Sequence, residues 1–142
     1  MAERLRVTLR WIQILDKMEP FYKERGEFRF SARVTGDART QETRFPPEGH
    51  YEISDHPAWN KLNLEKVIFE GEVSGQLKVE LTGEELDFLS ANDQLDHYER
   101  TFSGTPGSWL GQYGPGDDEA EIRPDDPENM NNWRISISIE RA

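Results

Sequence analysis

The residues whose types and spacing are best suited to a chemical role lie in one short acidic stretch, residues 83–98, which reads GEELDFLSANDQLDHY. Carboxylates gathered within a few ångströms repel one another unless they raise a pKa, move apart or share a cation. Calcium takes about 6 to 8 hard oxygen ligands in flexible geometry, so such a loop is suited to Ca²⁺. The acidic residues of this stretch are Glu84, Glu85, Asp87, Asp93 and Asp96.

Apolar residues recur with a period of two along most of the chain, which predicts β-strands. The acidic stretch is therefore expected to be positioned by strands. Residues 27–34, EFRFSARV, alternate without a fault and indicate a half-buried strand. Residues 4–15 alternate up to Trp11, where a shift of phase predicts a β-bulge. Short strands separated by Gly, Pro, Asp and Asn predict an all-β, antiparallel, eight-stranded Greek-key β-sandwich. The other expected strands are 40–53, broken by Pro46-Pro47, then 64–72, 76–82, 97–103, a weak one at 119–123, and 133–141.

The direction of the strands decides which loops meet. Successive antiparallel strands reverse, so alternate loops lie at the same end of a sandwich. The acidic stretch then shares one end with the loops at residues 16–26, 54–60 and 124–132. The sequence therefore predicts that four polar loops converge at one end.

Composition limits the function classes. The 142 residues are sized for one domain, residues 1–142, with a long acidic loop insertion at about 104–132. The net charge of −11 disfavours nucleic acid and a bare anionic bilayer as partners. The absence of cysteine excludes disulfides and thiolate metal sites. No stretch approaches the roughly 20 apolar residues needed for a transmembrane segment, so we expect a soluble protein, cytoplasmic or peripheral to a membrane.

The order of motifs resembles the C2 domain, a family of calcium-dependent phospholipid-binding β-sandwiches. Residues 56–81, HPAWNKLNLEKVIFEGEVSGQLKVEL, are similar to the Asn-Pro-x-Trp-Asn stretch and the two following strands in the middle of that domain. The resemblance covers about residues 4–103 and the final strand. Residues 104–132 are longer and more acidic than the family's pattern. The resemblance implies a divergent, non-enzymatic calcium-binding module.

The resemblance also implies a set of metal ligands. The family's third calcium loop carries carboxylates spaced D-x-D-x5-D, and that register falls here on Glu85, Asp87 and Asp93. Its first loop offers two more positions, which are matched by Asp16 and Glu27. Glu85 and Glu27 stand where Asp is usual. The longer side chain orders less readily, which predicts weaker calcium affinity or the loss of one ion position.

Apolar residues accompany these carboxylates. In the family, such residues enter the lipid interface once calcium neutralises the loops, which marks Phe21, Tyr22, Phe88 and Leu89 as membrane or partner contacts. The simpler interpretation is that these side chains fold back onto the sandwich.

The sequence leaves more than one function open. The first is a non-enzymatic calcium-binding module that docks to a phospholipid membrane or a protein partner through its calcium-filled loops. The second is a metal-independent β-sandwich module, structural or protein-binding, whose acids form a solvated face or meet a basic partner. An acid–base hydrolase ranks behind both, because no aromatic-lined cleft can be located. A zinc site of His50, Asp55 and His56 is also disfavoured, because the histidines fall on a strand and a loop without a shared face.

Overall fold

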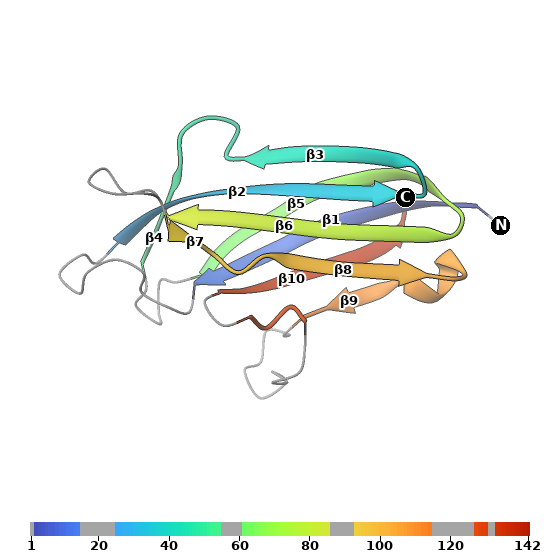
Figure 1. Cartoon of the computed structure of the whole chain (residues 1–142). Helices are drawn as coiled ribbons and strands as arrows, with labels where there is room; N and C mark the ends of the chain where they lie inside the picture. The colour runs from blue at the N-terminus through green and yellow to red at the C-terminus, as the bar shows by residue number, and fades with distance from the viewer. Residues whose placement is uncertain (1, 15–24, 55–60, 86–92, 115–126, 131–132) are drawn as a thin grey trace.

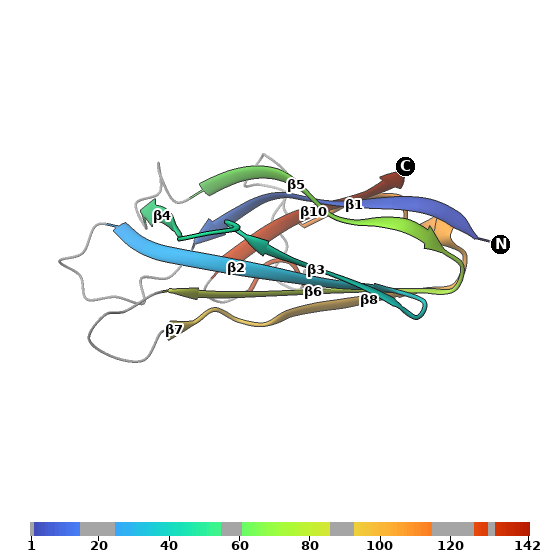
Figure 2. The ribbon, with the colours of Figure 1, turned by 90° about the horizontal axis from the view of Figure 1, so that it is seen from above.

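A computed structural model describes residues 2–14, 25–54, 61–85, 93–114, 127–130 and 133–142. Two antiparallel sheets pack face to face in this part of the chain, and the two layers separate clearly when the molecule is turned (Figures 1 and 2). The first sheet has the strand order β5-β1-β10-β9. Its members are β1 (Glu3–Ile14), β5 (Lys61–Val73), β9 (Gly111–Tyr113) and β10 (Trp133–Arg141).

The second sheet also has four strand positions, with β2 and β6 side by side in its centre. The short strands β3 and β4 pair one after the other with the outer side of β2, and β7 and β8 pair in the same way with the outer side of β6. The described part of the chain is therefore all-β, and its strands fill eight positions in two four-stranded antiparallel sheets, as the alternation of apolar residues predicts. No helix among the described residues is long and apolar enough to cross a membrane. The second sheet contains β2 (Arg25–Gly36), β3 (Arg39–Phe45), β4 (Tyr51–Ser54), β6 (Gln76–Glu85), β7 (Asp93–Gln94) and β8 (Tyr98–Ser103), and the 3-10 helix η1 (Pro106–Trp109) leads from β8 towards β9.

Two irregularities expected from the sequence are present. The segment containing Pro46 and Pro47 separates β3 from β4. The bulge in β1 lies between Leu9 and Trp11, one residue earlier than predicted, and it shifts the register with both neighbouring strands. Ile12 therefore joins the core cluster in place of Trp11. The weak strand expected at 119–123 lies outside the described residues. The described strand that precedes β10 in the chain is β9.

Aromatic side chains from both sheets meet in the core. The ring of Phe30 in β2 stacks on that of Trp133 in β10, with centroids 5.7 Å apart, and on that of Phe45 in β3, at 5.6 Å. All three side chains are buried. Each large apolar side chain removed from water stabilises the fold by about 1.5–3 kcal/mol, so this cluster joins the two layers strongly.

The strand ends that flank the predicted acidic loops lie at one end of the sandwich, which we call the loop end (Figure 1). In the first sheet, the register pairs the end of β1 with the starts of β5 and β10. In the second sheet, it pairs the start of β2 with the ends of β4 and β6. The chain therefore enters and leaves residues 15–24, 55–60, 86–92 and 131–132 here. The residues that define the loop end are Ile14, Arg25, Ser54, Lys61, Glu85, Asp93 and Trp133.

The opposite end is fastened by Asp37, in the turn between β2 and β3. Its carboxylate accepts hydrogen bonds from the backbone N–H groups of Ser74, Gly75 and Gln76 at 2.9, 3.0 and 3.2 Å, and from the Ser74 hydroxyl at 3.0 Å. The N–H groups of Gly75 and Ser74 lower the pKa of Asp37 from 3.8 to about 2. The charged carboxylate thus connects the β2–β3 turn to the β5–β6 turn.

We predict that Asp37→Asn lowers the thermal unfolding midpoint at neutral pH, because an amide has one acceptor oxygen where the carboxylate has two. The pKa of Asp37 is lower in the folded than in the unfolded chain. The stability that it contributes is therefore complete above about pH 4 and is lost as the pH falls towards 2. The gap between the midpoints of the wild type and the variant should narrow over this range. Glu48→Gln removes an exposed charge as a control, and the same pH-dependent gap in both variants would contradict the prediction.

Candidate functional site

Two of the five predicted calcium ligands have described side chains. Glu85 is the last residue of β6, and it is 2% exposed. Glu27 lies in β2 with its side chain 25% exposed. Its Oε1 is 3.8 Å from Nε2 of His50, and its Oε2 is buried without a hydrogen-bond partner. Asp93 pairs with Glu85 through the β6–β7 ladder. Asp16 and Asp87 lie outside the described residues.

The register of β2 against β6 determines on which face of the sheet the side chains of Glu85 and Glu27 lie. Glu85 is directly opposite Phe28, a core residue, so its side chain leaves the sheet on the inner face. Glu27 precedes Phe28 and therefore leaves the sheet on the outer face. The strands thus bring both residues to the loop end but do not place them on one face. A carboxylate buried like that of Glu85 is costly unless a hydrogen bond or a cation compensates it.

The predicted membrane or partner contacts lie outside the described residues, and they are Phe21, Tyr22, Phe88 and Leu89. The chain on either side of them is described, and it belongs to the loop end.

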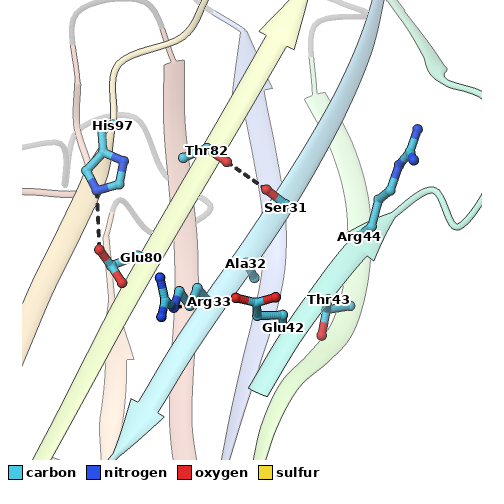
Figure 3. A pocket seen from close by; sticks show the side chains of 9 residues that line it. All are labelled: Ser31, Ala32, Arg33, Glu42, Thr43, Arg44, Glu80, Thr82 and His97. Atoms are coloured by element: carbon cyan, nitrogen blue, oxygen red, sulfur yellow. Dashed lines mark hydrogen bonds and ion pairs between the residues drawn. The ribbon is translucent and has the colours of Figure 1, made fainter. Parts of the chain in front are cut away.

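A second candidate site lies on the outer surface of the second sheet, which we call the polar face. Strand alternation sends the hydrophobic side chains of β2 and β6 into the core and the polar ones outward. The outward side chains surround a cavity of about 480 Å³ (Figure 3). Smaller depressions of about 240 and 370 Å³ adjoin it along the same strands. The cavity is lined by Ser31, Ala32, Arg33, Glu42, Thr43, Arg44, Glu80, Thr82 and His97.

The cavity contains both hydrogen-bond donors and acceptors. The hydroxyls of Ser31 and Thr82 lie 2.7 Å apart across the β2–β6 pair (Figure 3). Arg33 Nε lies 3.5 Å from Glu42 Oε1 across the β2–β3 pair. Arg44 is exposed, and no ion pair joins it to another described residue. The cavity therefore offers a guanidinium to a bound group without the loss of an existing ion pair.

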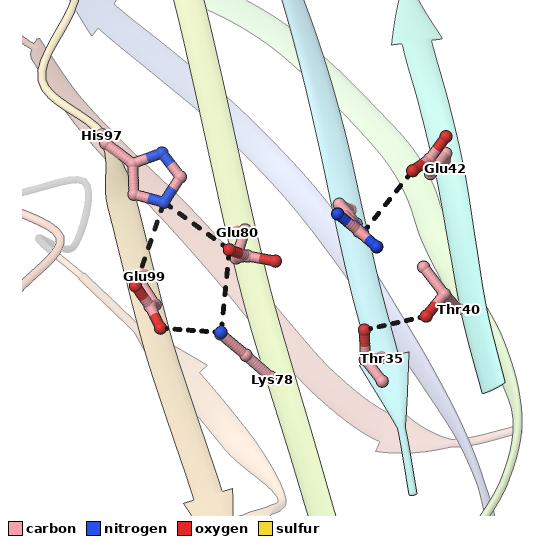
Figure 4. A network of polar contacts seen from close by, with 8 residues as sticks. Thr35, Thr40, Glu42, Lys78, Glu80, His97 and Glu99 are labelled. Atoms are coloured by element: carbon pink, nitrogen blue, oxygen red, sulfur yellow. Dashed lines mark hydrogen bonds and ion pairs between the residues drawn. The ribbon is translucent and has the colours of Figure 1, made fainter. Parts of the chain in front are cut away.

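Four charged or titratable residues form a network at the side of the cavity nearer β8 (Figure 4). Lys78 Nζ lies 2.9 Å from Glu99 Oε1 and 3.8 Å from Glu80 Oε1. His97 Nε2 lies 3.7 Å from Glu80 Oε1 and 4.0 Å from Glu99 Oε2. The hydrogen bond between Lys78 and Glu99 lowers the pKa of Glu99 and raises that of Lys78. The network thus joins two carboxylates to one lysine and one imidazole.

Sequence reasoning did not find this network, although part of its signal was visible. His97 and Glu99 are two residues apart, which is the spacing of neighbours on one face of a strand. The side chain of His97 is exposed just before β8. The contact with Glu80 depends on the register of β6 against β8, which the local pattern does not encode.

A third polar cluster is structural, and it closes the open edge of the sandwich. Glu128 is 0% exposed, although the sequence places it in an acidic loop. Its Oε2 accepts a hydrogen bond of 2.5 Å from the Tyr98 hydroxyl, and both of its oxygens accept from Arg100 Nη1, at 2.8 and 2.9 Å. Burial raises the pKa of Tyr98, and the neighbouring Glu128 carboxylate raises it further. The tyrosine therefore stays protonated and donates this hydrogen bond.

No protein-family model matches this chain, and no curated protein matches it. A β-sandwich architecture is compatible with many activities, since function depends on the side chains that a fold carries. The β-sandwich by itself therefore assigns no function to this chain.

Proposed function

We propose that this protein is a non-enzymatic, C2-like β-sandwich module that binds Ca²⁺ at its loop end and, with the ion bound, docks to a phospholipid membrane or a protein partner. The observation that carries the proposal is the arrangement of strand ends around the acidic segments. Residues 15–24, 55–60 and 86–92 contain five acidic residues and two lysines, and all three segments are entered and left at this end.

A described carboxylate at the loop end supports a cation there. Glu27 keeps one of its two carboxylate oxygens buried without a hydrogen-bond partner. Calcium accepts carboxylate, backbone carbonyl and water oxygens in irregular cages, whereas Mg²⁺ demands near-octahedral geometry and zinc favours His or Cys. Because Glu27 and Glu85 leave the sheet on opposite faces, a Ca²⁺ ion at the loop end would take further ligands from the acidic segments between the strands.

The net charge explains why docking should depend on calcium. A protein of charge −11 is repelled by an anionic bilayer. Calcium at the loop end would reduce the local negative charge where Phe21, Tyr22, Phe88 and Leu89 flank the ligand candidates in the sequence. Apolar and aromatic side chains can then enter the headgroup region, where they bind by burying apolar area.

We predict that calcium raises the thermal unfolding midpoint relative to EDTA. A ligand at 100 times its dissociation constant stabilises the native state by about 2.7 kcal/mol. Weak calcium modules have dissociation constants of about 0.1–1 mM, so a titration to about 10 mM covers the expected range. An unchanged midpoint at that concentration would contradict calcium binding.

Paired variants locate the ion. Asp87→Asn combined with Asp93→Asn should abolish the calcium-dependent shift, because an amide carries no charge and ligates more weakly than a carboxylate. Asp96→Asn is the matched control, since it lies in the same acidic stretch but outside the proposed register.

Calcium-dependent sedimentation with phosphatidylserine vesicles tests the membrane part. A calcium-induced shift without sedimentation would favour a protein partner.

A specific observation favours a second candidate, a metal-independent protein-interaction module. The polar face presents a cavity of about 480 Å³ in which Arg44 has no ion-pair partner among the described residues. Such a surface can dock a polar partner without any ion. This function predicts a partner that stays bound in EDTA and is lost on Arg44→Glu, whereas the calcium function predicts release by EDTA.

A further inference from the structure

We propose that Glu80, His97 and Glu99 on the polar face form a binding site for a first-row divalent transition-metal ion, with Zn²⁺ as the representative ion. The site shares no residue with the proposed calcium site, and it involves a different class of metal. It is therefore independent of the function proposed above.

The strand register brings the three side chains together. Glu80 in β6 is directly opposite Glu99 in β8. His97 precedes Glu99 by two residues and projects towards the same face (Figure 4). One nitrogen or oxygen from each residue lies within 4.8 Å of the other two. All three therefore approach one point from adjoining backbone segments.

The distances are close to those of a metal-bound set. In a tetrahedral zinc site, bonds of about 2.0–2.2 Å place neighbouring ligand atoms about 3.3–3.6 Å apart. His97 Nε2 is 3.7 Å from Glu80 Oε1 and 4.0 Å from Glu99 Oε2. Movements of about 1 Å by the half-buried Glu80 side chain and the exposed side chains of His97 and Glu99 would bring the three ligand atoms to these distances, with the backbone ladder unchanged.

Lys78 is compatible with a bound ion, because it uses the other oxygen of Glu99. Its Nζ is 2.9 Å from Glu99 Oε1, which leaves Oε2 on the side of His97 (Figure 4). Carboxylates that bind metals are commonly hydrogen-bonded in this way by a neighbouring donor. Lys78 would keep that contact with Glu99 and give up its longer one to Glu80 at 3.8 Å.

The electrostatics of the strand pair favour an additional cation. Like charges directly opposite each other on paired strands destabilise the pair, and Glu80 and Glu99 are such a pair. Lys78 supplies one permanent positive charge for these two carboxylates. A divalent ion bound by His97 and these two carboxylates would offset the charge that remains.

The ligand types select the class of ion. One imidazole with two carboxylates suits zinc and its first-row neighbours, whereas calcium needs more oxygen ligands than these three residues provide. Glu80 and His97 also line the cavity of about 480 Å³ (Figure 3). A fourth coordination position would therefore open into the cavity, where water or a bound group can occupy it.

Calorimetric titration of the full chain with ZnCl₂ tests the proposal, with the visible absorption of Co²⁺ as a second readout of coordination. One ion should bind per chain. His97→Ala and Glu99→Gln should each weaken binding by about tenfold or more, because a three-ligand site loses one ligand. Acidification should also weaken binding, since metal ligands must be deprotonated.

Two control variants make the test specific. His50→Ala removes another histidine that lies beside a carboxylate, and Glu42→Gln removes a carboxylate from the same cavity. Both should bind Zn²⁺ as the wild type does, and circular dichroism should confirm that every variant is folded. Absence of binding at about 1 mM Zn²⁺, equal binding by His97→Ala, or loss of binding in His50→Ala would overturn the proposal. The Asp87→Asn, Asp93→Asn protein should bind Zn²⁺ normally, so the two metal proposals can fail separately.

Discussion

Replacement of Glu128 by Ala should lower the free energy of unfolding by about 3 kcal/mol, because it separates a charged pair whose acidic member is inaccessible to solvent. The side chain of Glu128 accepts hydrogen bonds from Tyr98 and Arg100. The variant would leave the buried Tyr98 hydroxyl without this acceptor and the Arg100 guanidinium without its counter-charge. Breaking a buried pair costs about 3–5 kcal/mol. The lower end applies here, since the Arg100 side chain is 29% exposed and can be partly hydrated.

Urea denaturation of matched variants measures this effect. Glu128→Gln retains one acceptor oxygen and should lose less stability than Glu128→Ala. Glu140→Ala removes an exposed acidic residue whose Oε1 lies 3.7 Å from Arg6 Nη1. Exposed pairs of this kind contribute about 0–1 kcal/mol, so Glu140→Ala should change stability little. If Glu128→Ala cost no more than Glu140→Ala, the cluster would not stabilise the sandwich edge.

The burial of Glu128 could not be predicted from the sequence pattern around it. Residues 124–132 are rich in acidic residues and contain prolines, which is the usual composition of a solvated loop. One signal for an exception was present on the partner strand. Tyr98, Arg100 and Phe102 alternate along β8, with Tyr98 and Phe102 in the core. An arginine between two inward-facing positions needs a buried acceptor, but the sequence pattern does not name which acid supplies it.

The strands were predictable because their pattern is local. An alternation of polar and apolar residues is sufficient to identify β2, β6 and β10, since each buries one face against the core. The acidic residues at the end of β6 were harder to assign. Glu84 and Glu85 look like the start of a loop, yet Phe28 pairs with Glu85 and the ladder continues to it. Pairing with a strand distant in the sequence therefore outweighed the local composition.

The polar face was less predictable for the same reason. The contacts of Glu80 with His97 and of Arg33 with Glu42 follow from the register between neighbouring strands. A shift of one residue would send each side chain to the other face. The sequence predicts that a sandwich forms and which residues face outward, but it does not predict which outward residues meet. All five candidate calcium ligands remain a prediction, and two of them, Asp16 and Asp87, lie outside the described residues.

Trp133→Ala should destabilise the fold more than Glu128→Ala does, with an expected loss of about 3–5 kcal/mol of unfolding free energy. The indole is fully buried and stacks on Phe30 of the opposite sheet at 5.7 Å. Its Nε1–H also donates to the backbone carbonyl of Asp96 at 2.6 Å. The small side chain would leave a cavity between the layers and remove the donor from that carbonyl. For a domain whose total stability is about 5–15 kcal/mol, a loss of this size is about a fifth of that stability or more.

Trp133→Phe separates the two contributions of the indole. A phenyl ring keeps most of the contact with Phe30, but it cannot donate to the Asp96 carbonyl, so we expect a loss of about 1–3 kcal/mol of unfolding free energy.

The missing hydrogen bond has a second consequence, because Asp96 directly precedes His97. Loss of this hydrogen bond should weaken the support of the backbone that positions the imidazole, and Zn²⁺ should then bind Trp133→Phe more weakly than the wild type at a temperature where both are folded. Equal Zn²⁺ affinity in the two proteins would show that Trp133 stabilises the core without positioning His97.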